Sequence, residues 1–227
     1  MYTVQDIRNH FINALVEENF ATDRTGSKTI ELLGASFIAD ERAIFGTPND
    51  DYIDNELNWY DSESTNIYDI SNNPPACWKM SANDHGEINS NYGLLCYSPK
   101  YHNQLSNALS ELIRNKDTRR ATIIYNRPSI WAEYNENDKN DFICTNAVTY
   151  YIRNDKIYCV VQMRSNDVIF GYKNDFAWQQ FMHREVVNLY NESLDSDEDE
   201  LGTGLMYWQV QNLHVYERHF HLVKEKE

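Results

Sequence analysis

The segment that most constrains the fold of this chain is a predicted β-hairpin between residues 145 and 164. Two strand-forming runs, TNAVTYYIR and KIYCVVQMR, are separated only by Asn154 and Asp155. Asn and Asp tolerate the left-handed backbone conformation that a two-residue hairpin turn requires. We therefore expect an antiparallel strand pair in the second half of the chain.

The rest of the sequence mixes helical and strand-like patterns. An apolar stripe at helical spacing predicts an N-terminal helix, and its members are Val4, Ile7, Phe11, Ile12 and Leu15. Further helices are expected at residues 50–60, 101–115 and 176–191, and further strands at residues 30–39, 121–126 and 204–216. Gly34 interrupts the first of these strands, and the acidic residues 191–200 are expected to form a solvated loop. The pattern shows no linker or repeat, so it predicts one α+β domain over residues 1–227, with a mixed, mostly antiparallel sheet flanked by helices.

Composition narrows the possible functions. The chain has 227 residues, of which 41% are hydrophobic and 24% charged, as in ordinary globular proteins. A net charge of -15 argues against a nonspecific DNA or RNA binder, but it allows a small anionic ligand held by a few arginines. No apolar stretch is long enough to span a bilayer, and the N-terminus lacks the pattern of a secretory signal. The four cysteines form no Cys-x-x-Cys pair, so we expect reduced thiols and no metal site.

Several arginines lie at the ends of loops or strands rather than inside helices. They are Arg24, Arg119, Arg120, Arg127 and Arg164. Scattered surface charge is the more common explanation for any one of them. However, an adjacent pair before a strand, and an arginine beside Ser165 at another strand end, are typical of a phosphate site with charge-assisted hydrogen bonds.

The other candidates are ambiguous when each is taken alone. Cys144 precedes the hairpin, and a buried packing thiol is a more common role than a nucleophile, although nearby arginines would favour its thiolate. His214 and Tyr216 share one face of a strand, where core packing is common. Glu56 lies on the flank of a predicted helix, where it would normally face solvent. Asp175 enters an aromatic run, where a carboxylate is costly to bury without a partner.

The order of these motifs resembles the thymidylate synthase family from about residue 20 to about residue 220. The motifs, in chain order, are DRTG, NELNWY, NYG, DTRR, a cysteine before a hairpin, MRSNDVIFG and LHVY. Within that family the chain is most similar to the bacteriophage deoxycytidylate 5-hydroxymethyltransferases, through GEINSNYG, FICTN and NLHVYERHF. The resemblance implies the thymidylate synthase fold, a homodimer in the cytoplasm of an infected bacterium, and no contact with nucleic acid polymers or membranes.

The resemblance also implies a role for each motif residue. Cys144 would be the nucleophile that adds to C6 of the pyrimidine, and Glu56 would act in proton transfer with Tyr92 nearby. The nucleotide would be bound by Arg24, Arg164 and Ser165 at its phosphate, by Arg119 and Arg120 from the partner subunit, and by His214 and Tyr216 at the sugar. Asp167 would contact the pterin of 5,10-methylenetetrahydrofolate, the one-carbon donor.

Asp175 then has a specific explanation. Counting without gaps from Arg164, it lies where thymidylate synthases carry the asparagine that reads the base. An asparagine amide matches the N3–H and O4 of uracil, whereas cytosine presents an acceptor at N3 and a donor at N4. A carboxylic acid that shares one proton with N3 satisfies the cytosine pattern. The resemblance therefore implies hydroxymethylation of dCMP, with Asp175 in both substrate binding and catalysis.

Two features depart from the thymidylate synthase pattern. The chain has ICT where synthases usually have PCH, which fits the hydroxymethyltransferase branch. It ends at HLVKEKE, where family members continue to a tail that folds over the folate, so either this form is shortened or closure is achieved differently. The alternatives are a dUMP methylase or hydroxymethylase, against which Asp175 argues, and a nucleotide-binding homologue without turnover.

Overall fold

The computed structural model describes residues 1–224, and the chain divides into two compact units. Unit 1 consists of residues 1–48 and 153–227, and unit 2 consists of residues 49–152, which are inserted into unit 1. Among residues 1–224, no helix is both long enough and apolar enough to cross a bilayer.

Unit 1 is built on a mixed sheet. Its strands are β1 (Tyr2–Thr3), β2 (Ala21–Thr22), β3 (Lys28–Ile38), β6 (Lys156–Asp167) and β7 (Gly202–Tyr216). They are arranged in the order β1-β3-β7-β6, with β2 paired to β3. The β3–β7 and β2–β3 pairs are antiparallel, whereas the β1–β3 and β6–β7 pairs are parallel. The mixed sheet of the predicted α+β fold is therefore confirmed.

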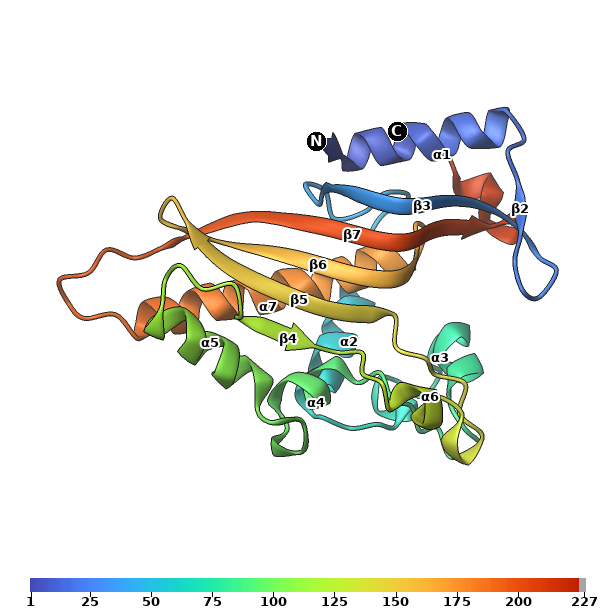
Figure 1. Cartoon of the computed structure of the whole chain (residues 1–227). Coiled ribbons are helices and arrows are strands. Elements are labelled where there is room, and N and C mark those ends of the chain that lie inside the picture. The colour runs from blue at the N-terminus through green and yellow to red at the C-terminus, as the bar shows by residue number, and fades with distance from the viewer. Residues whose placement is uncertain (225–227) are drawn as a thin grey trace. The chain divides into compact units, whose positions relative to one another are not determined.

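Two α-helices pack on this sheet. In Figure 1, α1 (Val4–Val16) lies beside β3, and α7 (Gly171–Glu192) runs along β6 and β7. Thr3 begins α1 with a capping box, in which Thr3 and Asp6 bond each other's backbone N–H groups. Tyr172 of α7 packs against Phe37 of β3 and Trp208 of β7, with ring centroids 5.9 and 5.2 Å apart, and all three side chains are fully buried. Burial of these large side chains fixes α7 on the sheet.

The alternation of buried and exposed residues shifts by one position on β3, β6 and β7, at the same level of the sheet. On β7 the buried positions are 206, 208 and 210 and then 213 and 215, and on β6 they are 157, 159, 161 and 163 and then 166. The same shift occurs on β3 next to Gly34, whose φ of +68° is a conformation that favours glycine. We call this level the phase break. It leaves two consecutive residues on β6, Arg164 and Ser165, only half-buried, whereas strict alternation would bury one of them.

Unit 2 is mainly helical. Its elements are α2 (Asp50–Asp61), α3 (Ala76–Ser81), α4 (Tyr92–Tyr97), α5 (Gln104–Arg114), β4 (Thr122–Ile124), α6 (Ile130–Glu133) and β5 (Thr145–Arg153), whose last residue belongs to unit 1. Short 3-10 turns are found at Ile67–Asp69, Pro99–Tyr101 and Glu136–Asp138, and in unit 1 at Glu217–Leu222. β4 pairs with β5 in antiparallel fashion, and α4 packs against both α2 and α5.

Most of the predicted elements are present. β5 and β6 span the two predicted hairpin strands, and Asn154 and Asp155 have φ values of 49° and 56°, as the expected turn requires. α7 begins at Gly171 rather than at Phe176, because Asp167 accepts hydrogen bonds from the backbone of the preceding turn. No element was expected at the positions of the short helices α3, α4 and α6. Whether the chain is a single domain over residues 1–227 stays a prediction.

Candidate active site

Two of the three predicted phosphate residues of unit 1 lie at the phase break. Arg164 and Ser165 are adjacent on β6 and both are half-buried, so neither side chain is enclosed in the hydrophobic core. Ser165 is in register with Asn212 of β7, and Asp167 is in register with His214. The ends of β6 and β7 therefore bring these predicted residues close together.

His214 and Tyr216 share one face of β7, as predicted. Both are half-buried, whereas Leu213 and Val215 between and before them are fully buried. The two rings meet edge to face with their centroids 5.0 Å apart. This face carries an imidazole and a phenol beside the end of β6, which suits recognition of a hydroxyl group.

Asp167 uses its two carboxylate oxygens differently. Oδ1 accepts hydrogen bonds from the backbone N–H groups of Ile169, Phe170 and Gly171, at 3.0, 2.7 and 3.4 Å. It thereby begins α7, where a negative charge is favoured by the helix dipole. Oδ2 is buried and has no hydrogen-bond partner among residues 1–224. A buried carboxylate oxygen without a donor is costly, so a ligand N–H group would stabilise it.

Asp175, in the first turns of α7, is held by a buried amide that the sequence reasoning missed. The Asn166 side chain is 3% exposed, and its Nδ2 donates to Asp175 Oδ2 at 2.7 Å. The indole Nε1 of the fully buried Trp208 donates to Asn166 Oδ1 at 3.2 Å. Because an indole N–H can only donate, the orientation of the Asn166 amide is fixed. Asn166 stands inside the RSND motif, but its burial follows from the phase break, which strict alternation does not predict.

Arg24 lies at the tip of a tight loop in unit 1. Asp23 accepts hydrogen bonds from the backbone N–H groups of Thr25 and Ser27 and from the Thr25 hydroxyl, at 2.8, 2.9 and 2.7 Å. The Thr25 hydroxyl bond is the main cause that lowers the pKa of Asp23. The loop therefore has a defined shape, and the exposed Arg24 side chain extends from it.

In unit 2, Cys144 immediately precedes β5 and is half-buried. The loop before it is fastened by Asp141, which accepts hydrogen bonds from the Asn89 and Ser90 backbone N–H groups and from the Ser90 hydroxyl, at 2.6, 2.7 and 2.7 Å. Burial raises the pKa of the Asp141 carboxyl, and these donors oppose that effect. The position of Cys144 is thus tied to the GEINSN segment.

Tyr92 is joined to the residue after Cys144. Its hydroxyl accepts a hydrogen bond from Thr145 Oγ1 at 3.0 Å, and its ring stacks on Tyr60 of α2 with centroids 5.3 Å apart. Asn91 caps α4 through the Leu94 N–H. Gly93 is required because a Cβ at this position would lie 1.9 Å from the carbonyl oxygen of Tyr60. The NYG motif therefore lets Tyr92 approach both α2 and β5.

Glu56 is buried rather than solvent-facing, which corrects the expectation from the helical pattern. Its side chain is 5% exposed, whereas the neighbouring Leu57 is only half-buried. Oε1 of Glu56 accepts hydrogen bonds from the Tyr52 hydroxyl at 2.5 Å and from Trp78 Nε1 at 3.1 Å. Burial is the main cause that raises the pKa of Glu56, and the two donors lower it. A carboxyl in such a setting can exchange a proton closer to neutral pH.

The two predicted arginines of unit 2 are both exposed, but they differ in their ion pairs. Arg120 forms an ion pair with Glu111 of α5 at 3.0 Å, with its side chain 74% exposed. Arg119 makes no hydrogen bond or ion pair with residues 1–224. Both side chains are exposed, and Arg120 would have to leave Glu111 to bind a ligand.

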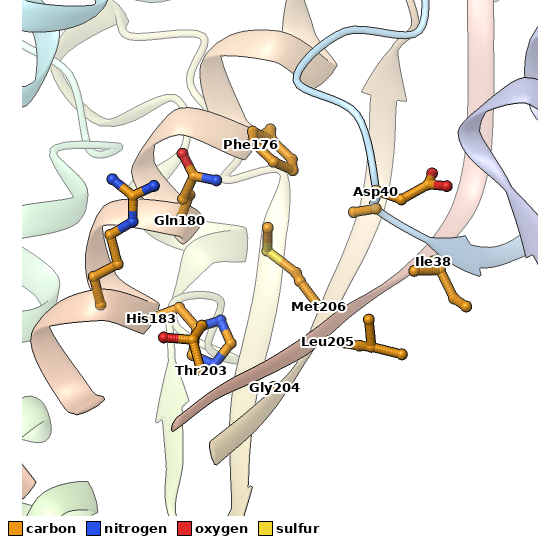
Figure 2. Close-up of a pocket in the computed structure, with 11 residues that line it drawn as sticks. Ile38, Asp40, Phe176, Gln180, His183, Thr203, Gly204, Leu205 and Met206 are labelled. Carbon is orange, nitrogen blue, oxygen red and sulfur yellow. The ribbon is translucent and has the colours of Figure 1, made fainter. Parts of the chain in front are cut away.

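One cavity of unit 1 is lined by none of these residues. It has a volume of about 290 Å³ and is lined by α7, the end of β3 and the start of β7. Figure 2 shows His183, Gln180 and Met206 around it. The ring of His183 forms a hydrogen bond with the backbone, with Nε2 2.6 Å from the Ile157 carbonyl oxygen. No predicted site residue lines this cavity, so the candidate site lies elsewhere.

Each unit therefore assembles one part of the predicted set. Unit 1 groups the residues expected to bind the nucleotide and folate, namely Arg164, Ser165, Asp167, Asp175, His214 and Tyr216, with Arg24 on a separate loop. Unit 2 groups the residues expected to do the chemistry, namely Cys144, Tyr92 and Glu56. Within residues 1–224, no cluster of His, Cys, Asp and Glu side chains could hold a metal ion.

Comparison with known proteins identifies the family. The thymidylate synthase family model matches residues 9–226. Deoxycytidylate 5-hydroxymethyltransferase of Enterobacteria phage T4 is 48% identical over 221 residues, which cover 97% of this chain and 89% of that protein, and the phage T6 protein of the same name matches equally. Thymidylate synthase of Buchnera aphidicola is 25% identical and covers 92% of the chain. This chain belongs to the thymidylate synthase family.

Proposed function

We propose that this chain is a deoxycytidylate 5-hydroxymethyltransferase, which converts dCMP into 5-hydroxymethyl-dCMP with 5,10-methylenetetrahydrofolate. The observation that carries the proposal is an acid, Asp175, held in a fixed orientation by Asn166 in a chain 48% identical to phage proteins of that name. Bound folate would supply a one-carbon unit at the oxidation level of formaldehyde.

Cys144 is the proposed nucleophile. Its thiolate adds to C6 of the cytosine ring, and the electron pair of the C5–C6 double bond then makes C5 nucleophilic toward the one-carbon unit. C5 must afterwards lose its proton, and the bond between the new exocyclic carbon and tetrahydrofolate must break. Water must then add to that carbon before the thiolate leaves C6. Glu56 is the proposed acid–base group for these proton transfers, because it is a buried carboxyl with a raised pKa.

Asp175 is the proposed base reader. Asn166 donates to Oδ2, so this oxygen acts as an acceptor and can also accept the proton that it shares with N3 of cytosine. The other oxygen then accepts from the N4 amino group. Uracil reverses both contacts, and mispaired buried polar groups should reject dUMP.

Asp167 is the proposed folate contact. The buried Oδ2 lacks a donor within residues 1–224, and the amino and N3–H groups of a pterin are donors of the required kind. The sugar hydroxyl would be bound by His214 and Tyr216, and the phosphate by Arg24, Arg164 and Ser165. These assignments follow the family motif, and each residue lies at the end of a strand or on a loop.

A homodimer is proposed to complete the phosphate site. Arg119 and Arg120 are exposed and would be supplied by the partner subunit. Unit 1 also exposes apolar side chains of its sheet, with Leu33 71% and Leu205 46% exposed. Exposed apolar side chains on a sheet are suited to burial against a second copy.

The test is mass analysis of the product formed from dCMP and 5,10-methylenetetrahydrofolate. The expected product is heavier than dCMP by one CH2O unit. Tritium release from 5-labelled dCMP separates an enzyme from a nucleotide-binding homologue, which would release none. Product formed from dUMP but not from dCMP would favour the alternative, a uracil nucleotide methylase or hydroxymethylase.

A further inference from the structure

Glu56 is restrained on one oxygen only. Oε1 accepts from the Tyr52 hydroxyl at 2.5 Å and from Trp78 Nε1 at 3.1 Å. The indole N–H is shared, because Trp78 Nε1 also lies 3.0 Å from the Tyr52 hydroxyl oxygen. Oε2 receives no hydrogen bond from the residues that the structure describes. The three side chains form a closed triangle of hydrogen bonds. Oε2 of Glu56 lies outside this triangle and can accept or release a proton.

The geometry of α2 brings Tyr52 to this position. Residues four apart lie on the same face of a helix, so the side chains at positions 52 and 56 are neighbours. The start of the helix is fixed by Asn49, whose side chain accepts from the Tyr52 backbone N–H at 3.2 Å. The Trp78 ring comes from α3 and packs edge-on against Trp59 of α2, with centroids 5.2 Å apart. Both donors are therefore anchored by their own elements.

The electrostatic balance at Glu56 depends on these two donors. Burial raises the pKa of Glu56, while Tyr52 and then Trp78 lower it. Burial and the nearby Glu56 carboxylate raise the pKa of Tyr52 well above its ordinary value, so Tyr52 remains a donor throughout the working pH range. From α3, Cys77 acts on Tyr52 in the same direction. α4, which packs against α2, carries Tyr92, whose hydroxyl accepts a hydrogen bond from Thr145.

We propose that Tyr52 is a positioning residue, which holds Oε1 of Glu56 and thereby directs proton transfer to Oε2. This inference rests on the proposed function, in which Glu56 exchanges the protons. A hydrogen bond to a charged carboxylate stabilises the ionised form. Loss of the Tyr52 hydroxyl therefore raises the pH at which Glu56 ionises and lets the carboxyl rotate.

The experiment compares Tyr52→Phe with wild type in pH profiles of kcat for tritium release from 5-labelled dCMP. Glu56→Gln first identifies the limb of the profile that belongs to Glu56, because that limb is lost. In Tyr52→Phe this limb should move to higher pH by about 1 or more, with kcat reduced at neutral pH and the KM for dCMP changed little. Trp78→Phe should move it in the same direction, and Tyr68→Phe, at a half-exposed tyrosine of the same unit, should leave it in place.

A second measurement does not depend on activity. The infrared C=O band of protonated Glu56, isolated as the difference from Glu56→Gln, gives the titration midpoint of this carboxyl in the folded protein. The midpoint should rise in Tyr52→Phe by the same amount as the kinetic limb. An unchanged midpoint would overturn the role of Tyr52, whereas a wild-type protein that releases no tritium would overturn the proposed function and leave the infrared result to decide on Tyr52.

Discussion

Replacing Asp175 with asparagine should shift the preference of the enzyme from dCMP toward dUMP. The substitution changes one oxygen of residue 175 into an amino group and keeps its size. Asn166 Nδ2, fixed by the indole of Trp208, still needs an acceptor at 2.7 Å, and the new amide oxygen can provide it. The buried network should therefore survive, so the change is confined to the groups that face the base.

The magnitude follows from the number of contacts that change. The acid satisfies both the N3 acceptor and the N4 donor of cytosine, and an amide that matches uracil mispairs with both. Each mispaired buried polar group costs about 1–3 kcal/mol, so two of them should change the specificity ratio by roughly a hundredfold or more. Because the Asn166 bond is kept, the free energy of unfolding should change far less than the specificity does.

The assay is kcat/KM for dCMP and dUMP in wild type and in Asp175→Asn, with urea unfolding to confirm the fold. Asn174→Ala is the matched control, since Asn174 precedes Asp175 on α7 and should leave the dCMP:dUMP ratio unchanged. An unmoved ratio in Asp175→Asn would refute Asp175 as the base reader and make Asn174 the candidate. Loss of activity on both nucleotides by a folded variant would instead give the acid a catalytic duty beyond reading the base.

Three further predictions concern the nucleophile, the dimer and the fold. Cys144→Ser should lower turnover by several orders of magnitude while dCMP binding, measured by calorimetry, stays largely intact, because an alcohol is a much weaker nucleophile than a thiolate; near-normal turnover would remove Cys144 from the mechanism. Mixing inactive Arg119→Ala/Arg120→Ala protein with inactive Cys144→Ser protein should restore activity, because the heterodimer has one site without either defect; no recovery after verified subunit exchange would mean that the arginines serve their own chain or neither site. Gly93→Ala should destabilise the protein by about 3 kcal/mol or more in urea unfolding, since its Cβ would lie 1.9 Å from the Tyr60 carbonyl oxygen, and wild-type stability would show that this close approach is not maintained.

The sequence predicted the elements whose local pattern and chemistry agree. The strands around Asn154 and Asp155 and the amphipathic helices were found because apolar spacing and turn residues point to the same structure. The shared face of His214 and Tyr216 was found for the same reason. The short elements α3 and α4 were missed because six residues give too few turns for a periodic pattern.

The networks around the candidate residues could not be read from local patterns. The burial of Glu56 depends on donors from two helices, and its position on α2 alone suggested a solvent-facing side chain. The hydrogen bond from Asn166 to Asp175 requires the phase break. The only sign of the phase break in the sequence was a glycine inside a predicted strand. Such contacts depend on tertiary packing, which spacing along the chain does not encode.

Because of the phase break, β3 must keep its number of residues if its buried side chains are to stay in the core. If evolution or an engineer removed Gly34, the residues before it on β3 would slip by one position against β7. Each would then exchange faces, so that Ile30 would leave the core and Glu31 would enter it. Homologous proteins with this strand should therefore vary freely in sequence at its exposed positions. Selection should remove insertions and deletions from the strand.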